Sequence, residues 1–443
     1  MSATEIPIVG FSKFLKHARN IVKNPLPFHS KNFEKHGDIF KLKISPKNHV
    51  FFSRNPDFLK YTLQKNQRNY TKSKIQTKDL KKYVGNGLLT NEGDSWRKQR
   101  KLIQPAFHKK QLALLLETME SVIKEEVAQI PTDKELDIFP FCNDLAFKVV
   151  ATSLFSSHIG DAIINRLQVI TEEAQKMLVK ELRQPFLNWY FTHFGPIKKH
   201  IGMTQEAKDL LLQLINDRRA SGTRYDDLLD MLLDARYEDG SEMDEQQLID
   251  EILILFVAGH ETTANALTFA FQLLAKHPEE QEKLREATAF AKESSSNLME
   301  YLRAHEYAKQ VIEETMRLYP PAYFIDRVNL EEDSFENYSF PKDSNLLFSV
   351  YEIHRHEKYW EEPEKFNPAR FANNAGMKHP AYFPFGAGPR MCIGNNFAMY
   401  EMILAVTEVV DSYSIISSHS DITIKPLITL KPKEAVLKFT SRG

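Results

Sequence analysis

Apolar residues recur with the three-to-four-residue spacing of helices over most of the chain, from about residue 56 to residue 320. Strand-like alternation is confined to three shorter parts, at about 37–55, 322–350 and 412–440. No internal repeat is visible, and no linker rich in Ser, Gly and Pro divides the chain into large parts. These patterns predict a mainly α fold with a minor β part, organised as a single domain over residues 1–443.

The longest predicted helix runs from Asp244 to Lys276, a segment without proline that begins with acidic residues and is followed by His277-Pro278. At ~1.5 Å per residue, its roughly 33 residues would span about 50 Å. The centre of this segment is nearly all apolar, which predicts burial on most sides. A second helix is expected from His305 to Tyr319, where Pro320-Pro321 ends it.

The β part is predicted from local patterns. Residues 40–53 alternate around a Pro46-Lys47-Asn48 turn, and residues 337–344 are expected to form a turn between strands. The segment 422–439 is typical of a closing hairpin.

Composition excludes several classes of protein. The chain has 443 residues, of which 42% are apolar and 26% charged, so disordered and collagen-like proteins are excluded. Its 58 basic and 59 acidic residues leave a net charge of −1, which gives no overall attraction for nucleic acid or an anionic membrane. The longest apolar run, 252–258, is too short to span a bilayer, and residues 1–20 lack the apolar stretch of a signal peptide. We therefore expect a cytoplasmic protein without a membrane anchor.

The two cysteines, Cys142 and Cys392, lie in unrelated surroundings, so we expect a reducing compartment and no disulfide framework. Cys142 falls on an apolar helical pattern and is expected to be a small core residue. Cys392 follows two glycines and an arginine and precedes a helical pattern, where backbone N–H groups and the helix dipole favour a thiolate. No base or zinc-type partner stands beside it, which indicates a metal that something else already holds, such as a porphyrin.

The segment around Cys392 resembles the signature loop FxxGxRxCxG of the haem-thiolate monooxygenases, the cytochromes P-450. All of its fixed positions match: Phe385, Gly388, Arg390, Cys392 and Gly394. The resemblance implies a prism-like helical domain with small β-sheets, in which haem b lies between the long central helix and the helix that follows the cysteine. It also implies that Cys392 is the iron ligand and that Phe385, Arg390 and Gly394 contact the haem.

The middle of the long helix carries the segment Ala258-Gly-His-Glu-Thr-Thr263. Buried polar groups in an apolar helix are costly unless they have a function. In the resembling family this position is a local bulge beside the haem, so Ala258 would contact haem, Thr262 would hydrogen-bond bound dioxygen and Glu261 would relay protons. The alternative is that a threonine hydroxyl bonds back to the helix and only bends it at Gly259.

Three further motifs resemble the same family. Glu314-Thr-Met-Arg317 resembles ExxR, and Pro368-Ala-Arg370-Phe371 resembles PxRF, with Ala369 in place of the frequent acidic residue. The resemblance implies a buried network of Glu314, Arg317 and Arg370 that supports the cysteine loop, although an exposed ion pair is the simpler explanation for ExxR alone. Residues 354–360 resemble the HRxxxxW segment, for which a structural role is expected rather than a metal site.

Haem propionates need cationic donors, and arginine suits carboxylates. By their motif positions, Trp96, Arg100, Arg327 and Arg390 would bind them, although a single arginine is more often a surface charge. Near Trp96 lies a basic stretch without an acid until Glu117; it comprises Arg97, Lys98, Arg100, Lys101, Lys109 and Lys110. A solvated helix face is its simplest explanation, and it has too few aromatics for a nucleic-acid platform. In the resembling family an acidic redox protein docks here.

The resemblance implies a monooxygenase that inserts one atom of dioxygen into a substrate C–H bond. Electrons would come from a ferredoxin or flavodoxin and its NAD(P)H-dependent reductase, and the protein is expected to be a monomer. A peroxide-using or isomerising enzyme and a haem sensor or carrier remain alternatives. The resemblance also implies that the substrate is a small organic molecule. Polar residues of the expected pocket favour a methoxylated sugar undergoing O-demethylation, and a fatty acid or terpene is the alternative. These residues are Gln76, Thr77, Lys78, Arg183, Gln184, Asn188, Tyr190, His193 and Tyr323.

Overall fold

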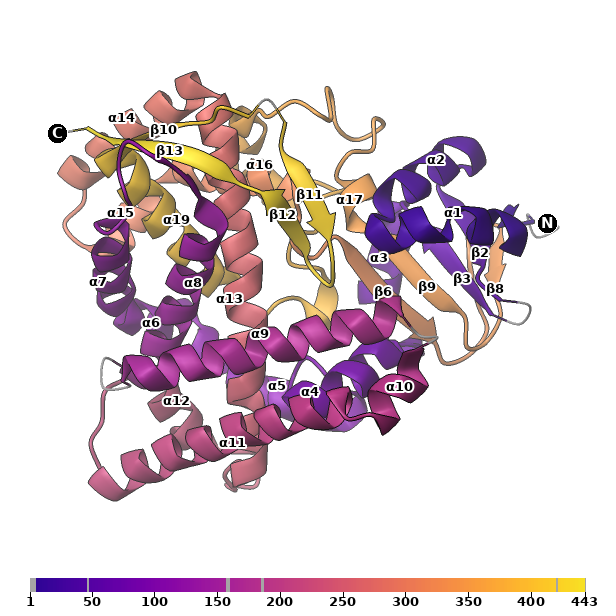
Figure 1. The fold of residues 1–443 in the computed structure, drawn as a ribbon, viewed down its shortest axis with the longest axis horizontal. Coiled ribbons are helices and arrows are strands. Elements are labelled where there is room, and N and C mark those ends of the chain that lie inside the picture. Colours follow the sequence, from indigo (N-terminus) through magenta and orange to yellow (C-terminus); the bar gives the residue numbers. More distant parts are fainter. Residues whose placement is uncertain (1–4, 46–47, 157–159, 185–186, 420, 443) are drawn as a thin grey trace. The chain divides into compact units, whose positions relative to one another are not determined.

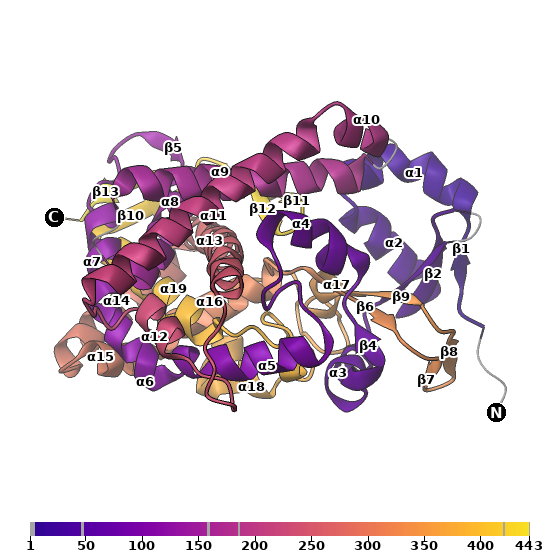
Figure 2. The same ribbon diagram turned by 90° about the horizontal axis from the view of Figure 1, so that it is seen from below.

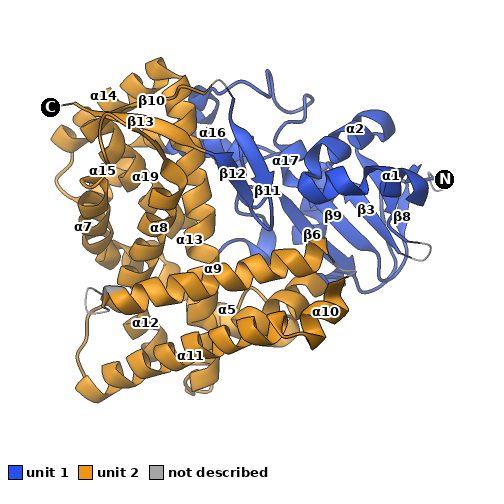
Figure 3. Cartoon of the chain, viewed as in Figure 1, with its two compact units in different colours: residues 1–73, 309–392, 421–434 blue, residues 74–308, 393–420, 435–443 orange. Residues whose placement is uncertain are grey.

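The computed structural model describes residues 5–45, 48–156, 160–184, 187–419 and 421–442. They form two compact units, and each unit is assembled from three segments that are remote in sequence (Figure 3). Unit 1 comprises residues 1–73, 309–392 and 421–434, and unit 2 comprises residues 74–308, 393–420 and 435–443. Neither unit is therefore a contiguous piece of the chain.

Unit 1 contains a six-stranded sheet in the order β1-β2-β3-β9-β6-β4. Strands β2 and β3 form an antiparallel hairpin in which Phe40 faces Phe52, whereas β3 and β9 pair in parallel. Phe58 of α3 stacks on Phe340 at 4.8 Å between ring centroids, within an apolar cluster beside the sheet. The strands of unit 1 are β1 Ile8–Val9, β2 Ile39–Lys43, β3 His49–Ser53, β4 Tyr70–Thr71, β6 Phe324–Asn329, β7 Asp333–Phe335, β8 Tyr338–Phe340, β9 Asn345–Ser349, β11 Thr423–Pro426 and β12 Leu430–Glu434. Its helices are α1 Phe11–Lys23, α2 Leu26–His36, α3 Pro56–Lys60, α17 Val350–Ile353, α18 Ala375–Lys378 and, from Lys309 onward, α16 Glu306–Leu318.

Unit 2 is built around the long helix α13, Glu245–Lys276 (Figure 1). The side chain of Asp244 caps its start by accepting a hydrogen bond from the N–H of Gln247, as an acidic residue at a helix N-terminus can. The other helices of the unit are α4 Lys81–Val84, α5 Gly93–Ile103, α6 Lys109–Leu112, α7 Leu116–Val127, α8 Ile138–Phe155, α9 Asp161–Arg183, α10 Asn188–His193, α11 Pro196–Ser221, α12 Leu228–Asp234, α14 Pro278–Ser294, α15 Leu298–Ala304 and α19 Asn395–Ser412. A small antiparallel sheet has the order β10-β13-β5, with β10 Tyr413–Ile416, β13 Val436–Ser441 and β5 Glu135–Asp137.

Helices α8 and α13 pack against each other along much of their length. Phe147 of α8 stacks on Phe256 of α13, with 5.0 Å between ring centroids. By length and composition alone, both helices could cross a membrane, but most of the apolar stretch of each is buried inside the protein. This packing accounts for their apolar composition.

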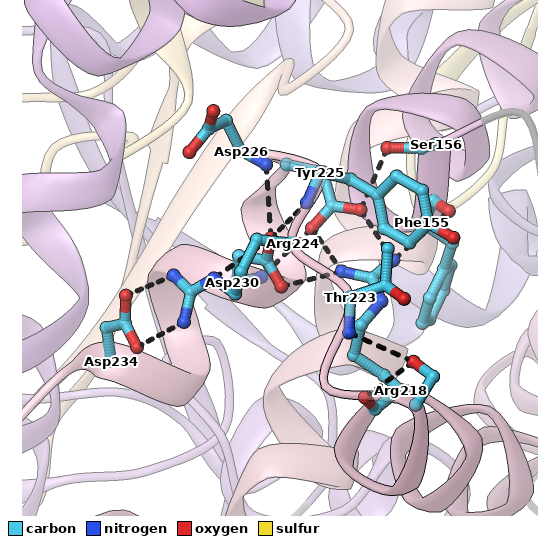
Figure 4. Close-up of polar contacts among 11 residues, drawn as sticks. Phe155, Ser156, Arg218, Thr223, Arg224, Tyr225, Asp226, Asp230 and Asp234 are labelled. Atoms are coloured by element: carbon cyan, nitrogen blue, oxygen red, sulfur yellow. Dashed lines mark hydrogen bonds and ion pairs between the residues drawn. The ribbon is translucent and has the colours of Figure 1, made fainter.

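A buried ion network fixes the end of α11, which lies beside α9 (Figure 2). Arg218 donates two hydrogen bonds to the carboxylate of Asp227, at 2.8 and 3.0 Å, and one to Asp230 at 2.7 Å (Figure 4). The hydroxyl of Ser156, just after α8, donates to Asp227 at 2.9 Å, and the guanidinium lies 4.4 Å from the ring centre of Tyr225. The network thereby ties α8, α11 and α12 together within unit 2.

Most of the elements predicted from sequence are present, and the mainly α fold with minor sheets is confirmed. The hairpin at residues 40–53 forms, although Pro46 and Lys47 of its expected turn lie outside the described residues. The segment 337–344 is not only a turn, because it contains the short strand β8, which pairs with β7. In the segment 422–439, β11 and β12 form the hairpin, whereas β13 pairs with β10 and β5 instead.

Candidate active site

The cysteine loop at 385–394 is shaped by two glycines with positive φ, Gly386 at +72° and Gly388 at +69°. A Cβ atom added to Gly388 would lie 2.0 Å from the carbonyl oxygen of Leu63, so a side chain there meets both backbone strain and a clash. The N–H of Cys392 donates to the carbonyl of Phe385 at 3.0 Å and closes the loop. Cys392 is exposed and is not part of a disulfide. Cys142, by contrast, is fully buried in α8, as predicted.

A buried ion pair lies in the same unit as this loop. Glu314 and Arg317 of α16 both have 0% side-chain exposure, and two hydrogen bonds of 2.7 and 2.9 Å join them. The guanidinium donates further hydrogen bonds to the carbonyls of His354, Pro363 and Lys365, at 2.9, 2.6 and 3.2 Å. The pair thus holds two backbone segments, at His354 and at Pro363 to Lys365, and the alternative of an exposed surface pair is excluded.

Arg370 completes the predicted network. Its Nε lies 3.4 Å from Oε1 of Glu314, and its Nη2 donates to the carbonyl of Glu362 at 2.9 Å. The same Glu314 oxygen accepts a hydrogen bond from the N–H of Asn367 at 2.9 Å. Two arginines therefore share one buried carboxylate, which confirms the predicted network of Glu314, Arg317 and Arg370.

His354 connects this network to the cysteine loop more directly than sequence indicated. Its carbonyl accepts from Arg317, while its ring Nε2 accepts a hydrogen bond of 2.8 Å from the N–H of Phe383, two residues before Phe385. Burial, together with the charges of Arg317 and Arg355, holds the pKa of His354 well below its ordinary value. The ring is therefore neutral and able to accept. Among the described residues, no group of three or more His, Cys, Asp or Glu side chains is placed to hold a metal ion, so a metal role for His354 and His356 finds no support.

One face of the otherwise buried central part of helix α13 is partly exposed, and we call its four positions the open stripe. Ala258 is exposed, and Leu255, Gly259 and Thr262 are partly exposed, whereas nearly all other residues from Glu251 to Ala275 are buried. These four positions follow the spacing i, i+3, i+4 and i+7 and therefore share one face of the helix. Of these four positions, only Thr262 carries a polar side-chain group.

Thr262 and Glu261 lie at the end of this stripe. The hydroxyl of Thr262 donates to the carbonyl of Ala258 at 2.8 Å, and Glu261 is buried. Helix α13 is continuous from Glu245 to Lys276, so the local bulge implied by the resemblance is not present. The hydrogen bond from the Thr262 hydroxyl to the Ala258 carbonyl is the back-bonding that the alternative explanation expects. The hydroxyl oxygen itself lies on the partly exposed face of the helix.

The predicted propionate ligands are placed as follows. Trp96 is buried in α5, and Arg100, on the same helix, donates from Nε to Oε1 of Gln104 at 3.2 Å. Arg327 is buried in β6 and donates to the carbonyl of Asp326 at 2.7 Å, and Arg390 is partly exposed in the cysteine loop. Unit 1 thus offers an exposed cysteine on a glycine-shaped loop and two arginines, which are the donor types that suit an anionic macrocycle carrying a metal. Unit 2 offers Trp96, Arg100 and the partly exposed face of α13.

A clamp on the loop after α4 was missed by the sequence analysis. The N–H groups of Asn86 and Leu88 donate to the carboxyl groups of Asp250 and Glu251 on α13, at 2.7 and 2.9 Å. Gly85, with φ of +80°, allows this approach, since a Cβ there would lie 2.2 Å from Asp250. Burial raises the pKa of Glu251 to about 7. The sequence signals that could have indicated this contact were the adjacent acids Asp250 and Glu251 on an apolar helix and the Gly85-Asn86-Gly87 sequence.

Comparison with known proteins decides the family. A family model described as cytochrome P-450 matches residues 2–439. The chain belongs to the cytochrome P-450 family. Pentalenene oxygenase of Streptomyces avermitilis is 28% identical over 99% of this chain and 96% of its own length. Cyclooctat-9-en-7-ol 5-monooxygenase of Streptomyces melanosporofaciens is also 28% identical, over 90% of this chain and 87% of its own. Echinocystic acid 23-monooxygenase of Saponaria officinalis is 33% identical over 83% of this chain and 76% of its own.

Membership of this family makes the chain a cytochrome P-450 monooxygenase, as predicted, and gives it a thiolate-ligated haem iron as cofactor. Cys392 is the cysteine that stands in the signature loop.

The basic stretch of this P-450 is less positive than its sequence indicates, because Arg97 pairs with Asp94 at 2.6 Å and Lys101 pairs with Glu238. Within the described part of the chain, Lys109 and Lys110 form no ion pair, whereas the charge of Lys98 helps to lower the pKa values of Glu238 and Asp239.

Proposed function

We propose that this P-450 binds haem b through the thiolate of Cys392 and hydroxylates an apolar small molecule. The observation that carries the proposal is the exposed Cys392 at the end of a glycine-shaped loop, in the same unit as a fully buried Glu314–Arg317 pair. A bound haem supplies the iron at which dioxygen is reduced and split. The overall reaction consumes dioxygen, two electrons and two protons, and yields one hydroxylated product and one water.

The proposal assigns haem binding to residues from several segments of the chain. Arg100, Arg327 and Arg390 would neutralise the propionates with Trp96 as a further donor, because guanidinium groups match carboxylates in charge and geometry. Phe385, Gly394 and Ala258 would form apolar or backbone contacts with the macrocycle. Cys392 would donate electron density to the iron, which favours O–O cleavage.

Thr262 and Glu261 are assigned to oxygen and proton handling. The hydroxyl of Thr262 can rotate from the Ala258 carbonyl and donate to dioxygen, since only one helical carbonyl holds it. Glu261 adjoins it in sequence and would pass protons from solvent toward that hydroxyl. With both residues in place, oxygen consumption should match product formation; a haem sensor or carrier would consume none.

An apolar substrate is favoured by the lining that can be identified within each unit. The open stripe of α13 offers Leu255, Ala258 and Gly259 and only one hydroxyl. The Tyr323 hydroxyl already donates to the carbonyl of Leu427 at 2.7 Å, and Asn188, Tyr190 and His193 are exposed on α10. Two relatives are named for pentalenene and cyclooctat-9-en-7-ol, a hydrocarbon and an unsaturated alcohol by their names. A terpene-like substrate therefore ranks above a methoxylated sugar.

Electrons are proposed to come from a ferredoxin or flavodoxin with its reductase, which docks on α5 and α6 through Lys98, Lys109 and Lys110. All three lysines are exposed, and among the described residues Lys109 and Lys110 form no ion pair, so they can attract an acidic partner. The charge of Lys98 is partly offset by Glu238 and Asp239. Reversing the charge of Lys98 and Lys109 should slow reduction by such a partner and weaken its salt dependence, whereas the paired Arg97 should matter less. Unchanged, salt-insensitive reduction would remove this docking site.

The experiment for the substrate class is a spin-state titration of the ferric protein. Panels of terpenes, fatty acids and methoxylated sugars are added separately, and the shift of the haem absorption is recorded. The proposal expects a response to the apolar panels. A response confined to the sugars would establish the O-demethylation reading instead.

A further inference from the structure

A pocket of about 440 Å³ lies among α7, α14, α15 and α19 of unit 2. Helices α7, α14 and α15 each contact α19 (Figure 1). The volume falls within the range of roughly 300–1,000 Å³ that is typical of small-molecule sites. None of the residues assigned above to haem, dioxygen or proton transfer lines this pocket. It is therefore formed by a different set of residues from the candidate active site.

The lining of the pocket combines apolar side chains with polar groups. Ile123 of α7 and Leu404 of α19 are buried where they line it, whereas Ser296 and Asn297, on the connection between α14 and α15, are exposed. Ser295 on the same connection has a buried hydroxyl oxygen that forms no hydrogen bond within the described residues. A buried hydroxyl without a partner is costly, so a ligand that hydrogen-bonds it is favoured. The pocket thus suits a ligand with an apolar body and a polar end.

The charged side chains at the pocket are paired in a way that leaves one carboxylate over. On α7, Lys124 pairs with Glu120 at 2.8 Å. Lys292 of α14 pairs with Asp411 of α19 at 2.6 Å. Glu408 of α19 also lines the pocket and forms no ion pair or hydrogen bond with a described residue. Its charge is therefore available to a cationic ligand.

Tyr301 of α15 shows that the pocket is negative at its centre. Burial raises the pKa of Tyr301 to about 12, with smaller contributions from the charges of Glu408, Asp411 and Glu120. An anionic ligand would meet the same three carboxylates and be repelled, whereas a cation would be attracted. The face of a tyrosine ring also attracts cations. The pocket therefore favours a cation over an anion of the same shape.

We propose that this pocket binds an organic ammonium ion with an apolar body, such as an aralkylamine. The ammonium group would pair with Glu408 and donate a hydrogen bond to the hydroxyl of Ser295. The face of Tyr301 would add a cation–π contact, and the apolar body would lie against Ile123 and Leu404. This binding goes beyond the proposed hydroxylation and does not depend on it, because the pocket uses none of the residues assigned to that reaction.

The test is isothermal titration calorimetry of the haem-loaded protein. The probes share a phenyl body and differ in charge: phenethylammonium, phenethyl alcohol and phenylpropionate. The haem absorption is recorded in parallel, because an amine that coordinates the iron shifts the Soret band. The pocket variants are Glu408→Gln, which removes the charge, and Leu298→Trp, which fills the space. Glu117→Gln is the matched control, since Glu117 is exposed on α7 one turn before Glu120 and does not line the pocket.

Phenethylammonium should bind the unaltered protein without shifting the Soret band, and more tightly than the alcohol or the propionate. Glu408→Gln should weaken this binding by about tenfold, because a charge-assisted contact is lost. Leu298→Trp should abolish it, and Glu117→Gln should leave it unchanged. Absence of binding by the unaltered protein overturns the proposal, as does binding that is equal for all the probes or unchanged in either pocket variant. Binding that shifts the Soret band and ignores both variants would place the amine at the haem instead.

Discussion

Replacing Arg317 by methionine tests the role of the buried ion pair. The side chain is fully buried, and it donates two hydrogen bonds to Glu314 and three to backbone carbonyls. Its loss leaves the Glu314 carboxylate with Arg370, at 3.4 Å, as its cationic partner and with the N–H of Asn367 at 2.9 Å, and it removes the charged donor from all three carbonyls. Breaking a buried pair on one side costs about 3–5 kcal/mol of unfolding free energy, because the remaining charge stays desolvated.

Arg97→Met is the matched control, since Arg97 and Asp94 on α5 have the same i, i+3 spacing but are 52% and 85% exposed. Its cost should stay below about 1 kcal/mol. Urea unfolding of the haem-loaded protein is followed by circular dichroism and by loss of the haem absorption. If the two variants differ by less than about 1 kcal/mol, the reasoning that burial makes the Glu314–Arg317 pair a structural node is refuted.

Four further predictions follow from the geometry. His354→Leu removes the acceptor for the N–H of Phe383 and should reduce the red-shifted absorption of the reduced, carbon monoxide-bound protein. His354→Gln, whose side chain can accept a hydrogen bond, should keep more of this absorption. Equal spectra for the two variants would contradict the coupling between His354 and the cysteine loop. Gly388→Ala should lower the free energy of unfolding by about 1–3 kcal/mol and weaken haem retention, because the added Cβ meets the Leu63 carbonyl. Gly202→Ala serves as the control, since nothing lies within 4 Å of a Cβ at that position. Thr262→Ala should uncouple oxygen consumption from product formation by about tenfold or more, and Thr262→Ser should restore coupling; unchanged coupling in the alanine variant would remove Thr262 from catalysis. Burial raises the pKa of Glu251 to about 7, so the folded state binds the proton of this carboxyl group more tightly than the unfolded state does. The free energy of unfolding should therefore fall by up to roughly 3 kcal/mol as the pH rises from about 5 to 7. Glu251→Gln should flatten this slope, and an identical slope in the variant would contradict the assignment.

Sequence was sufficient for features that depend on local chemistry. The start of α13 was predictable because Asp244 caps it through its own side chain, and the end because His277-Pro278 stops it. The cysteine loop was predictable because its shape depends on residues of the loop itself: Gly386 and Gly388 adopt positive φ angles, which favour glycine. The Glu314, Arg317 and Arg370 network was recognised only through the family resemblance, since the spacing alone is typical of an exposed pair.

Sequence was insufficient where contacts join distant segments. The acceptor role of His354 depends on the approach of Phe383, and the clamp by Asp250 and Glu251 depends on the approach of Asn86 and Leu88. A local pattern can mark the residues involved, as the adjacent acids and the Gly-x-Gly sequence do, but it does not specify which distant segments meet. Strand β13 left the predicted hairpin for the same reason, because its partners β5 and β10 lie elsewhere in the chain.

The central claim is that Cys392 binds haem iron as a thiolate. The most direct measurement is the absorption spectrum of the reduced, carbon monoxide-bound protein, recorded for the unaltered chain and for Cys392→Ala. The account predicts a strongly red-shifted Soret band that the alanine variant lacks. Its absence from the unaltered, haem-loaded protein, or its persistence in the variant, would contradict the account.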